Sequence, residues 1–156
     1  MKEKYADLLL KRCLCLKSTD SLFINAPIDS IEFIRILTKK AYKIGIKDIY
    51  LDLEDEELKR NELKYLSNEE LRNSKSFNKE IFDIYAKKNS AFLMLCGENP
   101  DTMNEIDKDK ISFTGKLLRE SKPIFKEKEI TYEIPWCIAL IPTHSYAKKV
   151  FPNDID

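Results

Sequence analysis

The amino-acid sequence predicts an α/β fold, a three-layer Rossmann-like domain with a mostly parallel sheet. Four short runs of residues are apolar throughout, which is typical of strands that are covered on both faces in a parallel sheet. Amphipathic helical segments alternate with these runs along the chain. The chain has 156 residues, of which 43% are hydrophobic and 35% charged, and this balance favours a single globular domain. We expect that domain to span residues 3–152.

The first half of the chain predicts a helix, a strand, a second helix and a second strand. Residues 3–16 carry apolar side chains at helical spacing, and Leu22–Ile24 form a short apolar run. A stripe of apolar residues over 31–44 then predicts another helix, and Asp48–Leu53 form the next strand. This strand–helix–strand unit has the length of a right-handed crossover between two parallel strands.

Three local patterns predict where helices begin and end. Asp29 and Glu32 have the spacing of a capping box, and so do Ser67 and Glu70. Gly45 follows the helix over 31–44, at a place where a left-handed residue commonly ends a helix.

The second half of the chain predicts two further strands, Ala91–Cys96 and Trp136–Ile141. Pro142 ends the second of them, because proline lacks the N–H that a strand needs. The other elements expected in this half are a charged helical stretch over 54–73 with a restart at Ser67, helices over 77–85 and 108–121, an extended segment over 130–134 and a last helical turn from Ser145.

Scarce residue types exclude several classes of function. The chain has three glycines, far apart in sequence, so it has no glycine-rich loop to hold a phosphate. Its one histidine, His144, cannot supply a histidine-rich catalytic zinc site. We expect His144 on a surface loop, with a role in acid–base chemistry as the alternative. Lysine plus arginine equal aspartate plus glutamate, so there is no basic field for nucleic acid.

The cysteines and apolar runs bear on cellular location. The four cysteines are Cys13, Cys15, Cys96 and Cys137, and we expect reduced, mostly buried thiols, with a metal or redox cluster as the alternative. Cys13 and Cys15 lie two apart on an expected helix, and would point to different faces rather than hold one ion. The apolar runs are too short to span a bilayer, and the first residues do not form a secretory signal. We therefore expect a cytoplasmic protein that binds neither membrane nor nucleic acid.

Polar side chains follow the predicted strands, at the sheet edge where open parallel sheets bind ligands. The candidates to line a cavity there are Asn25, Asp52, Glu98, Thr143 and His144. The acidic run over 52–57 lacks the glycine and the spacing of a calcium loop. We expect the acids of this run to stabilise a helix N-terminus through their interaction with the helix dipole. The alternative is that they form a metal site. No catalytic, metal or cofactor residue is assigned from spacing.

Several short motifs, in order along nearly the whole chain, resemble the N-terminal part of the thermophilic-type metallo-aminopeptidases, the aminopeptidase T, S and II group. Each motif alone is weakly specific, whereas the ordered set is more so. The motifs are Tyr5–Leu9, Ile24–Ile28, Phe33–Arg35, Ala41–Tyr42 with Gly45, Asp55–Glu56 before Arg60, Gly97–Asp101, Pro135–Cys137, Ile141–Thr143 and Ala147–Pro152.

The resemblance implies a domain without catalytic groups of its own. Members of this group are longer, and glutamate, histidine, aspartate and tyrosine ligands in a C-terminal domain hold two divalent metals, zinc or cobalt. The chain stops at Asp156, before that domain, and no family ligand or catalytic residue has a counterpart in it. The implied partners are the catalytic domain of the same parent, peptide substrates and a second parent copy in a homodimer.

Two other hypotheses remain open from sequence. The chain could be a stand-alone small-molecule binding module that uses the same sheet edge. It could also be a structural or interaction domain, which should expose an apolar patch and self-associate. The reading frame downstream of Asp156 discriminates the first alternative from a peptidase domain, and size-exclusion chromatography tests the second.

Overall fold

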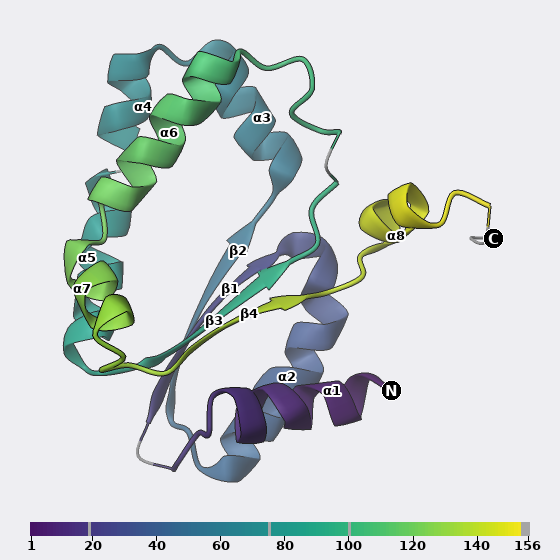
Figure 1. Ribbon diagram of the computed structural model, residues 1–156, viewed down its shortest axis with the longest axis vertical. Coiled ribbons are helices and arrows are strands. Elements are labelled where there is room, and N and C mark those ends of the chain that lie inside the picture. Colours follow the sequence, from purple (N-terminus) through teal and green to yellow (C-terminus); the bar gives the residue numbers. More distant parts are fainter. Residues whose placement is uncertain (19, 75, 100, 154–156) are drawn as a thin grey trace.

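The protein is described by a computed structural model for residues 1–18, 20–74, 76–99 and 101–153. Its centre is a four-stranded, all-parallel sheet in the order β2-β1-β3-β4 (Figure 1). The predicted α/β class with a parallel sheet is thereby confirmed. The strands are β1 (Ser21–Pro27), β2 (Asp48–Glu54), β3 (Ala91–Cys96) and β4 (Trp136–Leu140). The helices are α1 (Lys2–Leu8), the π-helical turn η1 (Leu9–Cys13), the 3-10 turn η2 (Ile28–Ser30), α2 (Ile31–Ile44), α3 (Glu56–Tyr65), α4 (Asn68–Ser74), α5 (Ser76–Lys87), α6 (Lys108–Glu120), α7 (Pro123–Ile130) and α8 (His144–Val150).

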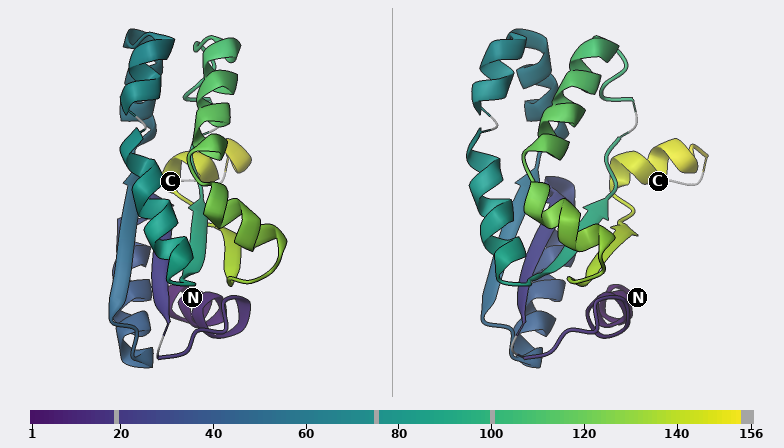
Figure 2. Two further views of the ribbon diagram at one scale, coloured as in Figure 1. Left: turned by 90° about the vertical axis from the view of Figure 1, so that its left-hand side faces the viewer. Right: turned by 60° about the vertical axis from the view of Figure 1, so that its left-hand side comes forward.

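One face of the sheet is covered by α1, η1 and α2 (Figure 2). The apolar stripe of α2 places Leu37 and Ala41 against the strands, where both are fully buried. Alternate strand residues such as Ile24 and Leu93 point to this side. Because burial of apolar surface is the main stabilising term, this cluster forms the principal core.

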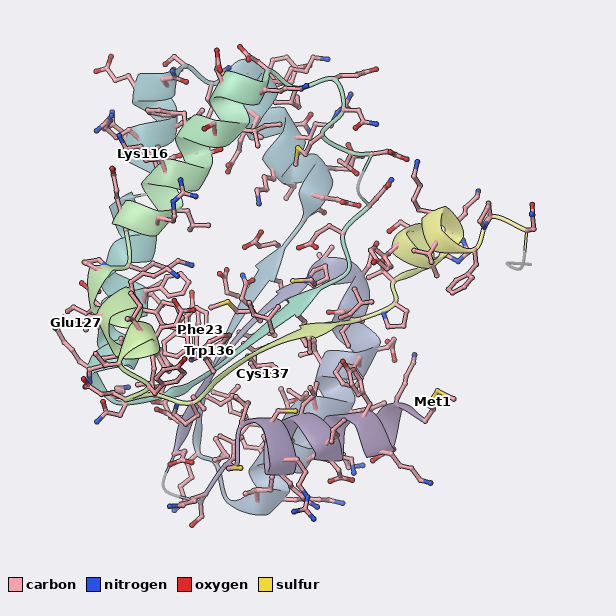
Figure 3. The ribbon with its side chains drawn as sticks, in the orientation of Figure 1. Met1, Phe23, Lys116, Glu127, Trp136 and Cys137 are labelled. Atoms are coloured by element: carbon pink, nitrogen blue, oxygen red, sulfur yellow. The ribbon has the colours of Figure 1, made fainter. Side chains whose placement is uncertain are left out.

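The opposite face holds an aromatic cluster under α5 and α7. Phe23 lies at its centre, with ring centroids 4.7 Å from Phe82 and 5.0 Å from Phe92. Phe125 from α7 packs 4.5 Å from Phe92. Figure 3 shows Phe23 and Trp136 on this side of the sheet. These rings cover the first residues of the strands, and among the side chains that the structure describes the cluster does not extend over the carboxyl half of this face.

A third, smaller cluster lies beyond the carboxyl end of the sheet. Leu63, Leu71 and Ile106 pack together there, from α3, α4 and the segment before α6. In Figure 1 these helices form an arch that extends past the strands. The capping box predicted for Ser67 and Glu70 is confirmed, since the Ser67 N–H donates to Glu70 Oε2 at 2.7 Å and the Glu70 N–H donates to Ser67 Oγ at 3.3 Å.

Some local predictions are wrong. The capping box of Asp29 and Glu32 does not form. The 3-10 turn η2 precedes α2, and no side chain caps the N-terminus of either element. Glu32 instead pairs with Arg35 one turn later. The segment over 130–134 is not extended: Ile130 is the last residue of α7, a helix that the sequence patterns did not predict, and a turn follows it. The Phe77 side chain, used to predict α5, lies outside those that the structure describes.

The prediction that all strands are buried on both faces is also wrong. β4 is an edge strand, and Trp136, Ile138 and Leu140 are 37%, 58% and 47% exposed. The expected burial of the thiols fails too, because Cys13, Cys15 and Cys96 are exposed and Cys137 is partly buried. Cys13 ends η1 and Cys15 lies past it with a φ of 50°, so the two do not share a helix. Apolar composition alone does not reveal which strand becomes the edge.

Candidate functional site

The carboxyl ends of β1 and β2 bring an amide and two carboxylates together. In the parallel register Asn25 lies beside Asp52, and Pro27 lies beside Glu54. The Asn25 amide donates to Asp52 Oδ2 at 3.1 Å and to Glu54 Oε1 at 2.8 Å. Of the predicted cavity residues, the structure therefore brings Asn25 and Asp52 into direct contact. Alternation along the strand places them on the same face as the aromatic cluster.

A pocket of about 180 Å³ opens beside Glu54, and Asn25 and Asp52 are not among the residues that line it. Its lining residues are Pro27, Ile28, Asp29, Glu54, Asp55, Glu56, Glu57, Gly97 and Glu98. Among the predicted residues, Glu98 lines it. The lining is dominated by carboxylates, so its electrostatic field favours cations and protonated amines over anions.

Two of these carboxylates, Asp55 and Glu56, also hold the backbone of the edge in place. Asp55 caps α3 by accepting from the N–H groups of Glu57 and Leu58 at 2.9 and 3.1 Å. Glu56 Oε2 accepts from the Asn99 N–H at 2.8 Å, and so ties α3 to the loop after β3. The acidic run over 52–57 was expected to stabilise a helix N-terminus. The structure supports this expectation for Asp55.

Thr143 joins the end of β3 to the start of α8. Its hydroxyl donates to the carbonyl of Gly97 and accepts from the Tyr146 N–H at 3.2 Å. Thr143 is 4% exposed, so its side chain serves this junction. A Cβ on Gly97 would lie 2.1 Å from the Ile141 carbonyl oxygen, which only glycine accommodates. His144, expected on a loop, is the exposed first residue of α8.

A second pocket, of about 320 Å³, lies between α3 and the loop before α6. Arg60 spans it, with Nη2 2.6 Å from Glu105 Oε2. The residues that line this pocket are Glu57, Arg60, Asn99, Asp101, Thr102, Asn104 and Glu105. Because Glu57 lines both pockets, the two lie next to each other along the sheet edge.

Lys122 packs on the aromatic cluster that covers one face of the sheet. It was not among the residues selected from the sequence. Its ammonium lies 4.6 Å from the ring centroid of Phe82 and 5.6 Å from that of Phe125. Burial and then the charge of Lys126 lower the pKa of Lys122, while the charges of Glu129, Glu54 and Asp52 act in the opposite direction. A lysine before Pro123 carries no sequence signal, since α7 itself was not predicted.

The cysteine at the end of β3 is also affected by this acidic edge. Cys96 is exposed as a residue, but partial burial of its thiol raises the pKa of Cys96, and the charges of Glu98 and Glu54 raise it further. This environment keeps Cys96 protonated and weakly nucleophilic at neutral pH.

The donor groups present do not fit a metal centre. In the part of the chain that the structure describes, no three side chains of the His, Cys, Asp or Glu types are placed to hold one ion. A zinc or cobalt site needs at least three such ligands converging on one point. Within the same residues, no helix has both the length and the apolar character needed to cross a bilayer.

Comparison with known proteins matches the whole chain to one protein family. The model of the thermophilic metalloprotease (M29) family matches residues 1–156. Aminopeptidase 2 of Geobacillus stearothermophilus is 26% identical over 149 residues, which make up 96% of this chain and 36% of that protein. Aminopeptidase T of Thermus thermophilus is 26% identical over 152 residues, or 97% of this chain and 37% of that protein.

A solved structure shares the fold. Wild-type AmpT from Thermus thermophilus matches with a TM-score of 0.87 and 24% sequence identity, over 98% of this chain and 38% of that one. The chain thus spans little more than a third of the length of these relatives.

Proposed function

The chain belongs to the thermophilic metalloprotease (M29) family, and on that premise we propose that it acts as the non-catalytic N-terminal domain of a metal-dependent aminopeptidase. Such an enzyme removes N-terminal residues from peptides. The observation that carries this proposal is the family match over the whole chain, combined with a donor set that does not fit a metal centre in the described residues. The metals, zinc or cobalt, and the reacting groups then come from other polypeptide.

The proposed role is to shape or cover the substrate cavity. The open carboxyl half of the sheet, the arch of α3, α4 and α6, and the two adjoining pockets supply a wall at one edge. The carboxylates at this edge attract the protonated amino group that every aminopeptidase substrate carries. The Asn25 amide, which contacts both Asp52 and Glu54, holds these two acids in fixed positions.

The remaining parts of the proposal concern assembly and location. The catalytic domain of the parent is the direct partner, and the parent works as a homodimer in the cytoplasm. Peptides are the only substrates in this proposal, and neither a membrane nor nucleic acid takes part.

An activity assay on the 156-residue chain tests the proposal. The purified chain is incubated with an amino-acid p-nitroanilide and with Zn²⁺ or Co²⁺, and release of p-nitroaniline is followed. We expect no hydrolysis above the metal-only control. Hydrolysis that depends on added metal and disappears with a chelator would show that the chain carries catalytic groups, and would overturn the proposal.

One observation favours a second candidate, an interaction domain. The apolar side chains of β4 are exposed in a row, and this strand carries no charge that would protect its edge from pairing. Edge strand β2, by contrast, carries Asp48, Asp52 and Glu54. Self-association of the isolated chain through β4, without any link to peptidase activity, would support this candidate.

A further inference from the structure

Two cysteines that are far apart in sequence meet where the first helix crosses the edge strand. The Tyr5 hydroxyl donates to the Leu140 carbonyl at 3.0 Å, and η1 packs against β4. Cys137 lies in register with Leu93 and packs against the core under α1 and η1. In Figure 3 it lies on the side of β4 that faces α1. Cys13, at the end of η1, lies close enough to Cys137 for the two thiols to interact, and the Cys137 thiol itself contacts the Ile138 carbonyl at 3.7 Å.

The other two cysteines have different surroundings. The Cys15 thiol donates to the Arg12 carbonyl at 3.2 Å, and Cys96 lies at the opposite end of β3, beside Glu98. Within the described residues, Cys13 and Cys137 are therefore the pair of thiols brought near each other, by the packing of η1 against β4. All four are free, so the pair is available for oxidation.

We propose that Cys13 and Cys137 form a reversible intramolecular disulfide, a redox latch that ties η1 to β4. This inference rests on the contacts of the chain itself and does not depend on the proposed peptidase function. It adds a modification site on the helix-covered side of the sheet, away from the acidic edge.

The oxidant in this step is a peroxide, with hydrogen peroxide as the simplest case. The Cys13 sulfur, which is exposed, attacks one peroxide oxygen, the O–O bond breaks, and a sulfenic acid and water form. The Cys137 sulfur then displaces the sulfenic oxygen, which takes up the thiol proton and leaves as a second water. The two thiols are oxidised to one disulfide and the peroxide is reduced to two waters. A dithiol reductant reverses the bond.

The environment of the pair assigns the order of these steps. Burial and the neighbouring Cys13 thiol raise the pKa of Cys137, so Cys137 stays protonated at neutral pH. Cys13 is the more exposed thiol and is reached first. The bond closes a loop that includes almost the whole sheet, and restricts the unfolded chain accordingly.

Oxidation of the full 156-residue chain with stoichiometric hydrogen peroxide tests the latch. We expect free thiols to fall from four to two, with a peptide map that joins Cys13 to Cys137. The thermal midpoint should rise by about 5 °C or more, and return after treatment with dithiothreitol. Cys13→Ser and Cys137→Ser should each abolish the cross-link, while Cys15→Ser, two residues from Cys13, should retain it.

Three results would overturn the proposal. One is retention of all four thiols at a peroxide level that oxidises free glutathione completely. Another is a map that joins Cys13 to Cys15 or to Cys96. The last is a disulfide between two chains in place of the intramolecular bond, seen as doubled mass on a non-reducing gel.

Discussion

The hydroxyl of Thr143 donates a hydrogen bond to the carbonyl of Gly97, and so fixes the end of β3 to the start of α8. The same oxygen accepts from the Tyr146 N–H and caps α8. One buried side chain thus holds two segments that the sequence separates by more than forty residues. Both segments border the acidic edge of the sheet.

Replacement of Thr143 by valine should destabilise the fold. Thr143→Val keeps the shape of the side chain but leaves the Gly97 carbonyl and the Tyr146 N–H without this partner. We expect a loss of about 1–2 kcal/mol in the free energy of unfolding, measured by urea denaturation. Thr131→Val, at an exposed threonine, is the matched control and should change it by less than about 0.5 kcal/mol. Equal effects of the two variants would contradict the role given to Thr143.

Two glycines should respond to alanine in opposite directions. Gly45 has a φ of 106°, and a Cβ there would lie 2.8 Å from Ser18 Cβ. Gly45→Ala should therefore cost about 1–2 kcal/mol. Gly115 lies inside α6, where a Cβ meets nothing closer than 3.9 Å, so Gly115→Ala should stabilise by about 0.5–1 kcal/mol. Denaturant midpoints of both variants check this, and the same sign for both would refute it.

Acid should weaken the contact between β2 and α5 through Asp48. Its carboxylate accepts from Lys88 Nζ and from the Tyr85 hydroxyl, both at 2.9 Å, and these bonds lower the pKa of Asp48. The lowered pKa means that the folded state favours the ionised form. This stabilisation is present above the unfolded value near 3.8 and is lost as the pH falls through the folded pKa.

Asp48→Asn should accordingly flatten the loss of stability below about pH 4. The Asp48 side chain is 43% exposed, so solvent screens the ion pair and the effect is small and best seen in low salt. Asp109→Asn, on α6, is a comparison variant at a position without such bonds to a lysine and a tyrosine. If the wild type and Asp48→Asn lose stability in parallel as the pH falls, the ion pair contributes nothing measurable.

The exposed edge strand should make the isolated chain associate at high concentration. Ile138, at the centre of β4, is the most exposed apolar residue of that strand. Ile138→Lys places a charge on the edge and should restore the monomer, whereas Ile130→Lys, at the end of α7, should not. Light scattering after size-exclusion chromatography gives the mass. A wild-type chain that is monomeric at every concentration would remove the support for pairing through β4.

Sequence patterns predicted the central part of the fold because apolar runs such as Ala91–Cys96 are short, uniform and bounded by turn residues. They did not reveal that Trp136–Leu140 lies at an edge, because a buried strand and an edge strand can have the same composition. Asn25 and Asp52 were selected from their positions after strands, and their direct contact follows from the parallel register. Their role in lining a substrate cavity stays a prediction.

Other groups had no local signal. The contact of Lys122 with two aromatic rings depends on how α5 and α7 pack. The meeting of Cys13 and Cys137 depends on the helix that crosses the edge strand, since the residues lie at opposite ends of the chain. Such pairs arise from tertiary packing, which spacing along one segment does not encode.

The metal content of the purified chain tests the central claim most directly. After dialysis against Zn²⁺ or Co²⁺ and removal of loosely bound ions, elemental analysis gives the number of ions per chain. The account predicts far less than one transition-metal ion per chain, because the described side chains offer no converging set of three ligands. Two ions retained per chain would contradict it and would place the hydrolytic centre within these residues.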